Sequence, residues 1–350
     1  MDRMINTTIK DVAAKAGVST KTVSRVINGL PYVSDKARSR VWEAANSLNY
    51  IPDEAGKQLA SMKYKSNVCT GNIGCILFPT YEKYTEPDSA EILEELDKVF
   101  LKRNLHQYFC YTLTELQDPI LFARMINPNK VDGCILIGLC DDHIDSIARI
   151  REKVPSVVLV GLVKDKNITC VYTDGVEGGY LAAKHLLKLG HRRIGCITGY
   201  SGHSNTELRF LGYKKALDEA GITPMVREGH FNIDGAAEAT DSLLDDANPP
   251  TAIFSVSDPM AIGVYKAIQR RGLQIPGDIS VAGFDDISLA KHIFPPLTTV
   301  SINKHEMVEV AVQTLMDQID GKRGSSMRIT FPVKLIVRGS TSKLDLNLHK

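Results

Sequence analysis

Apolar side chains recur at helical spacing in three short segments of the first fifty residues. Thr8 is followed three residues later by Asp11, the pattern of a capping box at a helix start, and Gly17 ends this first helix because glycine adopts the left-handed conformation at little cost. Ser19 and Ser34 stand where the N-caps of a second and a third helix are expected. Two short helices joined by a tight turn and braced by a third predict a helix-turn-helix.

From residue 72 onward, short apolar runs alternate with amphipathic segments. The runs have the length and composition of buried strands: 73–78, 106–112, 131–137, 157–160, 168–172, 194–198, 252–256 and 279–284. Between them, helices are predicted over 90–102, 174–189, 207–220 and 259–272. This alternation indicates an α/β body with parallel sheets covered by helices. Ligands of such sheets bind beyond the C-terminal ends of the strands, so a binding site is expected there.

The predicted second helix, residues 20–28, has one polar face with Thr20, Lys21 and Arg25 on it. In a helix-turn-helix, the leading side chains of this helix reach base edges in the major groove, where an arginine can bind guanine through two hydrogen bonds. Residues 1–63 carry ten Lys and Arg against six Asp and Glu, an excess that suits a DNA contact at this end of the chain. A three-helix scaffold with a solvated polar face is the alternative that this segment alone leaves open.

The composition narrows the class of protein. A length of 350 residues exceeds what one core usually supports, so two units are expected. The seven cysteines are scattered, without a C-x-x-C pair, and are read as reduced thiols. The N-terminus has no secretory signal pattern and no apolar run is long enough for a membrane span, which predicts a cytoplasmic protein without a membrane partner.

Several stretches of the head resemble the lactose-repressor (LacI/GalR) family of transcription regulators. They are Thr8-Ile-Lys-Asp-Val-Ala-Ala-Lys-Ala-Gly-Val-Ser19, Thr22-Val-Ser-Arg-Val-Ile-Asn28, Val33-Ser34 and Leu48-Asn-Tyr-Ile-Pro52. The resemblance implies that Thr20, Lys21 and Arg25 read bases, and that residues 1–50 form the DNA-binding head. It implies contacts to the DNA backbone for Ser19, Thr22, Ser24, Asn28 and Tyr32.

Residues 51–71 are interpreted as a hinge helix and linker. The segment 52–61 is too short for a stable isolated helix, so it is expected to fold only with DNA and a partner subunit. The resemblance implies that Leu59 wedges between base pairs in the minor groove, and packing of Leu59 into the third head helix is the alternative. Gly56 departs from the alanine usual in the family and should make this helix costlier to fold.

Three stretches of the body resemble the same family. They are Thr173-Asp-Gly-Val-Glu-Gly-Gly-Tyr180 with His185-Leu-Leu-Lys-Leu-Gly-His-Arg-Arg-Ile194, Leu208-Arg-Phe-Leu-Gly-Tyr213, and Ile279-Ser-Val-Ala-Gly-Phe-Asp-Asp-Ile287 with Pro295-Pro-Leu-Thr-Thr299. The resemblance implies a two-lobed, periplasmic-binding-protein-like body over 72–343 with an effector between the lobes. Chain crossings near Gly190, Val300 and Phe331 would divide it into lobe 1, about 72–189 and 301–330, and lobe 2, about 190–300 and 331–343, followed by a tail, 344–350.

The candidate effector-binding residues are Asp174, Arg209, Ser257, Asp258 and Asp285, of which Arg209 and Asp285 follow from the resemblance. Arg209 would bind a hydroxyl or ring oxygen and Asp285 would accept sugar hydroxyl protons; the alternatives are a surface arginine and a carboxylate that caps the segment after it. Asp258 and Asp174 are equally well explained as helix N-caps. The family's Asn-Pro-aromatic pattern is missing after residue 79, where Tyr81 is expected to shape one wall of the pocket instead.

These observations predict a transcription regulator, a repressor whose affinity for a palindromic operator is controlled by a small effector. A sugar is favoured over a purine by the aromatic wall, the carboxylates and the arginine. A homodimer is expected, because the last residues lack a heptad pattern for further assembly. The sequence has no nucleotide-binding or hydrolase motif, so neither an enzyme nor a cofactor is expected. A sugar- or nucleobase-binding protein without a direct DNA role is the alternative.

Overall fold

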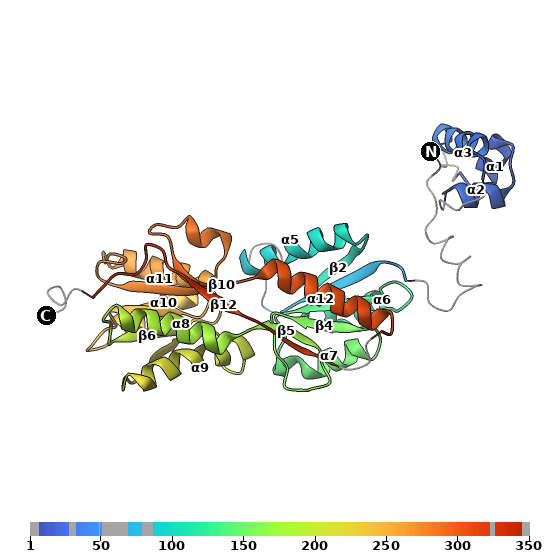
Figure 1. The fold of residues 1–350 in the computed structure, drawn as a ribbon. Helices are drawn as coiled ribbons and strands as arrows, with labels where there is room; N and C mark the ends of the chain where they lie inside the picture. Colours follow the sequence, from blue (N-terminus) through green and yellow to red (C-terminus); the bar gives the residue numbers. More distant parts are fainter. Residues whose placement is uncertain are drawn as a thin grey trace. The chain divides into compact units, whose positions relative to one another are not determined.

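The computed structural model describes residues 7–27, 33–48, 50, 69–78, 87–322 and 326–344. The chain forms two compact units, Met1–Val68 and Cys69–Lys350 (Figure 1). The predictions for Asn28, Tyr32, Gly56, Leu59 and Tyr81 concern residues outside the described part of the chain.

The first unit contains the three predicted helices, α1 (Ile9–Ala16), α2 (Thr20–Ile27) and α3 (Asp35–Ser47). The capping box at the start of α1 is present, since the Thr8 N–H donates to Asp11 Oδ2 at 2.8 Å. Gly17 ends the helix with a φ of +64°, as its left-handed cap requires. A small core of its own holds the helices together, formed by Val12, Ala13, Ala16, Val23, Val26, Val41, Ala44 and Ala45.

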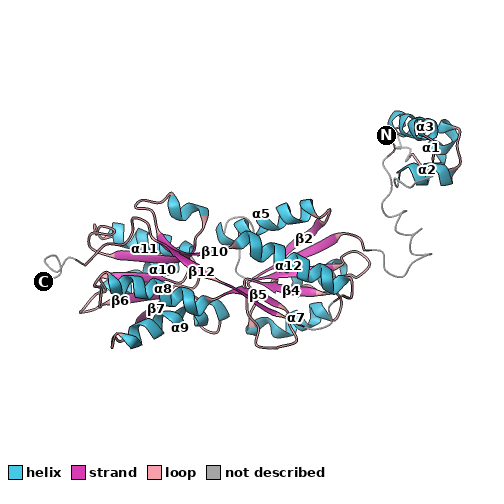
Figure 2. Cartoon of the chain, viewed as in Figure 1, coloured by secondary structure: helices cyan, strands magenta, loops and turns pink. Residues whose placement is uncertain are grey.

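The second unit is built on two six-stranded sheets, each flanked by helices (Figure 2). The first has the order β11-β5-β4-β3-β1-β2, with β1 (Asn72–Leu77), β2 (His106–Thr112), β3 (Gly133–Ile137), β4 (Ser156–Leu159), β5 (Cys170–Thr173) and β11 (Arg328–Phe331). The second has the order β12-β10-β9-β8-β6-β7, with β6 (Ile194–Thr198), β7 (Met225–Glu228), β8 (Ala252–Ser255), β9 (Ser280–Asp285), β10 (Thr298–Ile302) and β12 (Val333–Ile336). Neighbouring strands are parallel except for the antiparallel pair β10 and β12, which confirms the predicted fold class.

Each sheet with its helices forms one lobe. Lobe 1 has α5 (Pro87–Lys102), α6 (Pro119–Met125), α7 (Ile144–Arg151) and α12 (Lys304–Ile319). Lobe 2 has α8 (Gly175–Lys188), α9 (Ser204–Glu219), α10 (Ile233–Leu244) and α11 (Asp258–Arg270). Both lobes are buried mainly through Ile, Val and Leu on strands, the composition expected of sheets covered on both faces.

The chain passes between the lobes at Asp174, Asn303 and Pro332. The predicted first crossing near Gly190 is therefore wrong. Helix α8 belongs to lobe 2, because Gly178 leaves no room for a side chain: a Cβ there would lie 2.3 Å from the Phe284 ring on β9. The second crossing follows the end of β10, and the third separates β11 from β12.

The body also begins earlier than the predicted residue 72. The Asp132 carboxylate accepts hydrogen bonds from the Thr70 N–H at 2.9 Å and from the Gly71 N–H at 2.7 Å. These bonds fix residues 70 and 71 to lobe 1, so they are part of the folded body and not of a linker. Among the described helices of the chain, none is long and apolar enough to cross a bilayer.

Candidate effector site and DNA-contacting helix

Helix α2 presents the polar face that the sequence predicts. Thr20, Lys21 and Arg25 are exposed, while Val23 and Val26 on the opposite face are buried. Its first turn has no acidic residue, so nothing in that turn opposes an approaching phosphate.

Ser19 and Thr22 are tied together at the start of α2. The Ser19 Oγ accepts from the Thr22 N–H at 3.1 Å and lies 2.9 Å from the Thr22 Oγ1. Ser19 is exposed, whereas Thr22 and Ser24 are half-buried. The first turn of α2 is thus held by its own cap, which fixes the direction of the exposed side chains that follow it.

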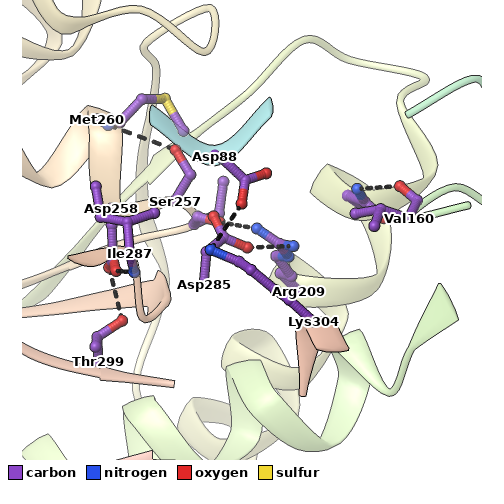
Figure 3. Close-up of polar contacts among 12 residues, drawn as sticks. Asp88, Val160, Arg209, Ser257, Asp258, Met260, Asp285, Ile287, Thr299 and Lys304 are labelled. Atoms are coloured by element: carbon purple, nitrogen blue, oxygen red, sulfur yellow. Dashed lines mark hydrogen bonds and ion pairs between the residues drawn. The ribbon is translucent and has the colours of Figure 1, made fainter. Parts of the chain in front are cut away.

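Arg209 on α9 is buried in lobe 2, with only 3% of its surface exposed, so it is not a surface arginine. Its Nη1 donates to the Val256 carbonyl at 2.6 Å, and its Nη2 lies 2.8 Å from Asp285 Oδ1 (Figure 3). The guanidinium also stacks over the Phe284 ring, 3.8 Å from its centroid. These three contacts come from the ends of two strands and fix the guanidinium at the C-terminal edge of the second sheet.

Asp285 is the last residue of β9 and is 2% exposed. Its φ is +108°, and that of Asp286 is +51°, both in a region that costs free energy for residues other than glycine. Burial raises the pKa of the Asp285 carboxyl to about 7, because loss of solvation outweighs the opposing effect of the Arg209 charge. A strained, buried carboxylate held by one arginine is typical of a functional site.

Arg209 and Asp285 lie at one cavity between the lobes. Lobe 1 contributes Asp88 and Ser89 from the first turn of α5. Lobe 2 contributes Asn205, Arg209, Phe231, Ser257, Pro259 and Asp285. The cavity therefore combines carboxylates, one arginine, an amide, hydroxyls and an aromatic ring, all beyond the C-terminal ends of parallel strands.

Hydrogen bonds also join the two lobes. The Asn205 Nδ2 donates to the Val160 carbonyl at 3.0 Å, and the Ser288 N–H donates to Glu91 Oε1 at 2.6 Å. Val160 has a φ of +55°, a rare conformation for a β-branched residue, and it aims this carbonyl at lobe 2 (Figure 3). The two lobes are thus in direct contact in this conformation.

A buried histidine adds an aromatic contact between the lobes. The His203 ring of lobe 2 meets Phe78 of lobe 1 at 5.0 Å between centroids and Phe231 at the same distance. Burial lowers the pKa of His203 to about 4, with a smaller effect from the Arg209 charge, so the ring is neutral at pH 7. A neutral His203 also accepts from the Asn205 N–H at 3.2 Å and caps α9.

The Asp258 carboxylate is held by hydrogen bonds within lobe 2. Of the described residues, those lining the cavity do not include Asp258. Its Oδ1 accepts from the Thr299 hydroxyl at 2.6 Å and its Oδ2 from the Ile287 N–H at 3.0 Å. Burial raises the pKa of this carboxyl well above its usual value. Asp258 thus stabilises the ends of the strands next to the cavity, and its predicted effector contact stays a prediction.

The remaining predicted residues divide between cap and cavity. Ser257, not Asp258, is the N-cap of α11, since its Oγ accepts from the Met260 N–H at 3.4 Å, and Ser257 also lines the cavity. Asp174 caps α8 by accepting from the Glu177 N–H at 2.9 Å and is not among the described residues at the cavity. The geometry therefore favours the interpretation of Asp174 as a helix N-cap.

The two parts of the chain match known families separately. Residues 8–53 match bacterial regulatory proteins, lacI family, and residues 183–341 match the periplasmic binding protein-like domain. The HTH-type transcriptional repressor PurR of Aliivibrio salmonicida (strain LFI1238) is 33% identical over 343 residues, which cover 96% of this chain and 99% of that protein. The chain belongs to the lacI family of bacterial regulatory proteins. This lacI-family chain is thus a DNA-binding transcription regulator with an effector-binding domain.

Two further proteins are similar over nearly the whole length of the regulator. The ribose operon repressor of Haemophilus influenzae (strain ATCC 51907 / DSM 11121 / KW20 / Rd) is 33% identical over 341 residues, covering 96% of this chain and 99% of that protein. The solved structure of the lac repressor dimer bound to operator and the anti-inducer ONPF superposes with a TM-score of 0.82 at 28% identity, covering 96% of this chain and 99% of that chain. The relatives named here are transcription repressors, not enzymes.

Sequence reasoning missed several cavity residues of this lacI-family regulator. Asn205 lies four residues before Arg209 on α9, so helical spacing alone could have placed both side chains on one face. Phe231 comes from a loop with a φ of +54°, and Asp88 comes from the other lobe. No local sequence pattern indicates these two residues, because only the tertiary fold brings them to the cavity.

Proposed function

We propose that this regulator is an operator-binding repressor whose DNA affinity is set by a sugar or sugar derivative bound between its lobes. The observation that carries the proposal is the Arg209–Asp285 pair, buried and strained at an interlobe cavity. A ligand that contacts both lobes binds one arrangement of them more tightly than another, and so shifts the population that fits the operator.

The chemistry of the cavity favours a sugar. Carboxylates accept hydrogen bonds from hydroxyls, Arg209 and Ser257 can donate to ring or hydroxyl oxygens, and the Phe231 ring offers a flat face for C–H groups. The name of the ribose operon repressor is consistent with this class. A nucleobase is the second candidate, favoured by the same Phe231 ring, which could stack on a planar ligand.

The effector role is tested by Asp285→Asn, which keeps the shape of the side chain but removes its charge. We expect operator affinity without effector to stay unchanged, and the effect of any active sugar on operator binding to be lost. Gel retardation and calorimetry with a panel of sugars and nucleobases measure the two quantities. Asp245→Asn, an exposed position of the same lobe, is the matched control. Unchanged sugar affinity in Asp285→Asn would rule out this site.

The head is proposed to read bases through Thr20, Lys21 and Arg25, with Ser19, Thr22 and Ser24 at the DNA backbone. Arg25→Ala should lose discrimination at one symmetric pair of base positions, costing about 1–3 kcal/mol per contact. Titration of single-base variants of an operator selected from random palindromes measures this loss. Arg40→Ala, exposed on α3, is the charge-matched control. A uniform loss on every sequence would make Arg25 a phosphate contact only.

The regulator is further proposed to act as a homodimer in the cytoplasm, without catalytic activity. A palindromic operator presents two half-sites, and a two-fold symmetric dimer is the assembly that matches them. Light scattering is expected to give twice the chain mass of 38.5 kDa, with and without operator. A stable tetramer or a monomer at micromolar concentration would contradict the dimer.

A further inference from the structure

Two carboxylates face each other across the cavity, one from each lobe. Asp285 projects from the end of β9 in lobe 2, and Asp88 projects from the first turn of α5 in lobe 1 (Figure 3). Asp285 Oδ1 and Asp88 Oδ1 are buried, and among the described residues neither oxygen has a partner in hydrogen-bond geometry. The cations beside them, Arg209 at 2.8 Å and Lys304 at 3.2 Å, are within ion-pair distance only.

Each of these buried oxygens is held by an ion pair without a well-directed hydrogen bond, so a ligand that donates to it would add the bond that is missing. An ionised carboxylate can only accept hydrogen bonds. A sugar hydroxyl, an amide or an ammonium group would supply the donor that it needs. Because the two oxygens belong to different lobes, one ligand with donors at both ends would satisfy both and hold the lobes together.

We propose that Asp88 is a second effector-binding carboxylate, and that Asp88 and Asp285 together restrict the effector to neutral or cationic molecules with hydrogen-bond donors at both ends. Phosphorylated and carboxylated sugars are excluded by this arrangement. The inference rests on the proposed function of the cavity and adds the charge class of its ligand.

The charges around the cavity support this exclusion. Arg209 is the one cation among the described lining residues, and it already contacts the Val256 carbonyl through Nη1 and Asp285 through Nη2. Lys304 on α12, with 10% of its side chain exposed, lies beside both carboxylates and pairs with Glu91 at 2.6 Å as well as with Asp88. An anionic ligand would thus meet two carboxylates and one arginine whose charge is already paired with Asp285, in a buried site where screening by water is weak.

Asp88 could instead be a structural acid at the start of α5, paired with Lys304. The distances argue against that as its whole role. The Lys304 ammonium is closer to Glu91 Oε2, at 2.6 Å, than to Asp88 Oδ1, at 3.2 Å. Lys304 therefore keeps a partner when Asp88 is neutralised, and Asp88→Asn is expected to fold.

The test compares neutral sugars with their charged counterparts on the full-length protein. Ribose and ribose 5-phosphate, and glucose, glucose 6-phosphate, gluconate and glucosamine, are the probes, screened by thermal shift and then measured by calorimetry. We expect a neutral or amino sugar to bind and its phosphorylated or carboxylated form to bind at least about tenfold more weakly. Asp88→Asn should weaken binding of the neutral sugar by about tenfold or more. It should also reduce the difference in affinity between the neutral and the phosphorylated sugar.

Glu94→Gln is the matched control, since Glu94 lies on the same helix with 66% of its side chain exposed and should leave both affinities unchanged. The inference would be overturned by a phosphorylated sugar that binds as tightly as its parent, or by an Asp88→Asn variant with unchanged affinity for the neutral sugar. Either result would leave the proposed function of the cavity standing. If no sugar of either kind shifts the wild-type melting temperature, the proposed sugar class fails, and the inference fails with it.

Discussion

At the scale of single residues, the unusual feature is a carboxylate that titrates near neutral pH. Asp285 is faced by Arg209 from α9, Asp88 from α5, Lys304 from α12 and, behind it, Asp258 from α11. Burial raises the pKa of Asp285 to about 7 although Arg209 and Lys304 oppose the shift. Below that pH the group carries a proton and loses acceptor capacity toward a ligand hydroxyl.

Effector affinity should therefore increase with pH across this range. If only the ionised form binds, the dissociation constant should be roughly tenfold larger at pH 6 than at pH 8, and binding near pH 7 should release a proton. Calorimetry of the active sugar in two buffers with different ionisation enthalpies measures both effects. An affinity that is flat from pH 6 to pH 8, with no proton release, would show that Asp285 stays ionised throughout.

Individual residues also show where sequence reasoning reaches its limit. Arg209 and Asp285 could be singled out from motifs, because each follows a recognisable local pattern. The sequence could not separate Asp258 from these two residues, since a carboxylate next to a strand end follows the same pattern whether it points into a cavity or at Thr299. Asp88 was not predicted at all, because its importance depends on a partner almost two hundred residues away in the chain.

At the scale of elements, the contact between α8 and α9 positions the site. Gly179 and Gly212 let the two backbones touch: a Cβ at either position would lie 1.9 Å from a carbonyl oxygen, of Arg209 and of Val176 respectively. The helix that carries Arg209 is therefore held against α8 without intervening side chains. Any side chain at this contact must push Arg209 away from Asp285.

Gly212→Ala is expected to lower the free energy of unfolding by about 1–3 kcal/mol, because the clash outweighs the gain in helix propensity of roughly 1 kcal/mol. Urea unfolding measures the change, and sugar affinity should fall with it. Gly277→Ala is the control, since its new Cβ would have its nearest neighbour, the Gln274 Cβ, at an ordinary 3.5 Å. Equal stability of the Gly212 variant would mean that the helices separate at little cost.

Some of the elements that the sequence pattern did not predict have a physical reason to be missed. The edge strands β7, β11 and β12 are short and only partly buried, so they lack the continuous apolar run of a central strand. Helix α8 was predicted with nearly correct bounds but assigned to the wrong lobe, because its pattern records which face is buried and not which sheet covers it. The buried strand β10 and the helices α6, α7, α10 and α12 were also not predicted, although α10 and α12 have apolar residues at helical spacing.

At the scale of the whole molecule, the three crossings interleave the two lobes along the chain. Each sheet receives an edge strand from the last part of the sequence, β11 for lobe 1 and β12 for lobe 2. The segment after β12 is also bonded into lobe 2, where the Ser340 hydroxyl donates to the Val281 carbonyl and accepts from the Thr298 N–H at 2.7 Å. Neither lobe is therefore a continuous stretch that could be cut out and expressed alone.

The same interleaving sets the order of events on the ribosome. The head, with a core of its own within residues 12–45, can fold while most of the chain is still unmade. Neither lobe can complete its sheet until residue 331 or 336 has left the exit tunnel, so both remain open at an edge almost to the end of synthesis. A stop codon shortly before Arg328 would thus release a finished helix-turn-helix attached to two incomplete sheets with exposed edges, a product prone to aggregate and without a complete body to respond to effector.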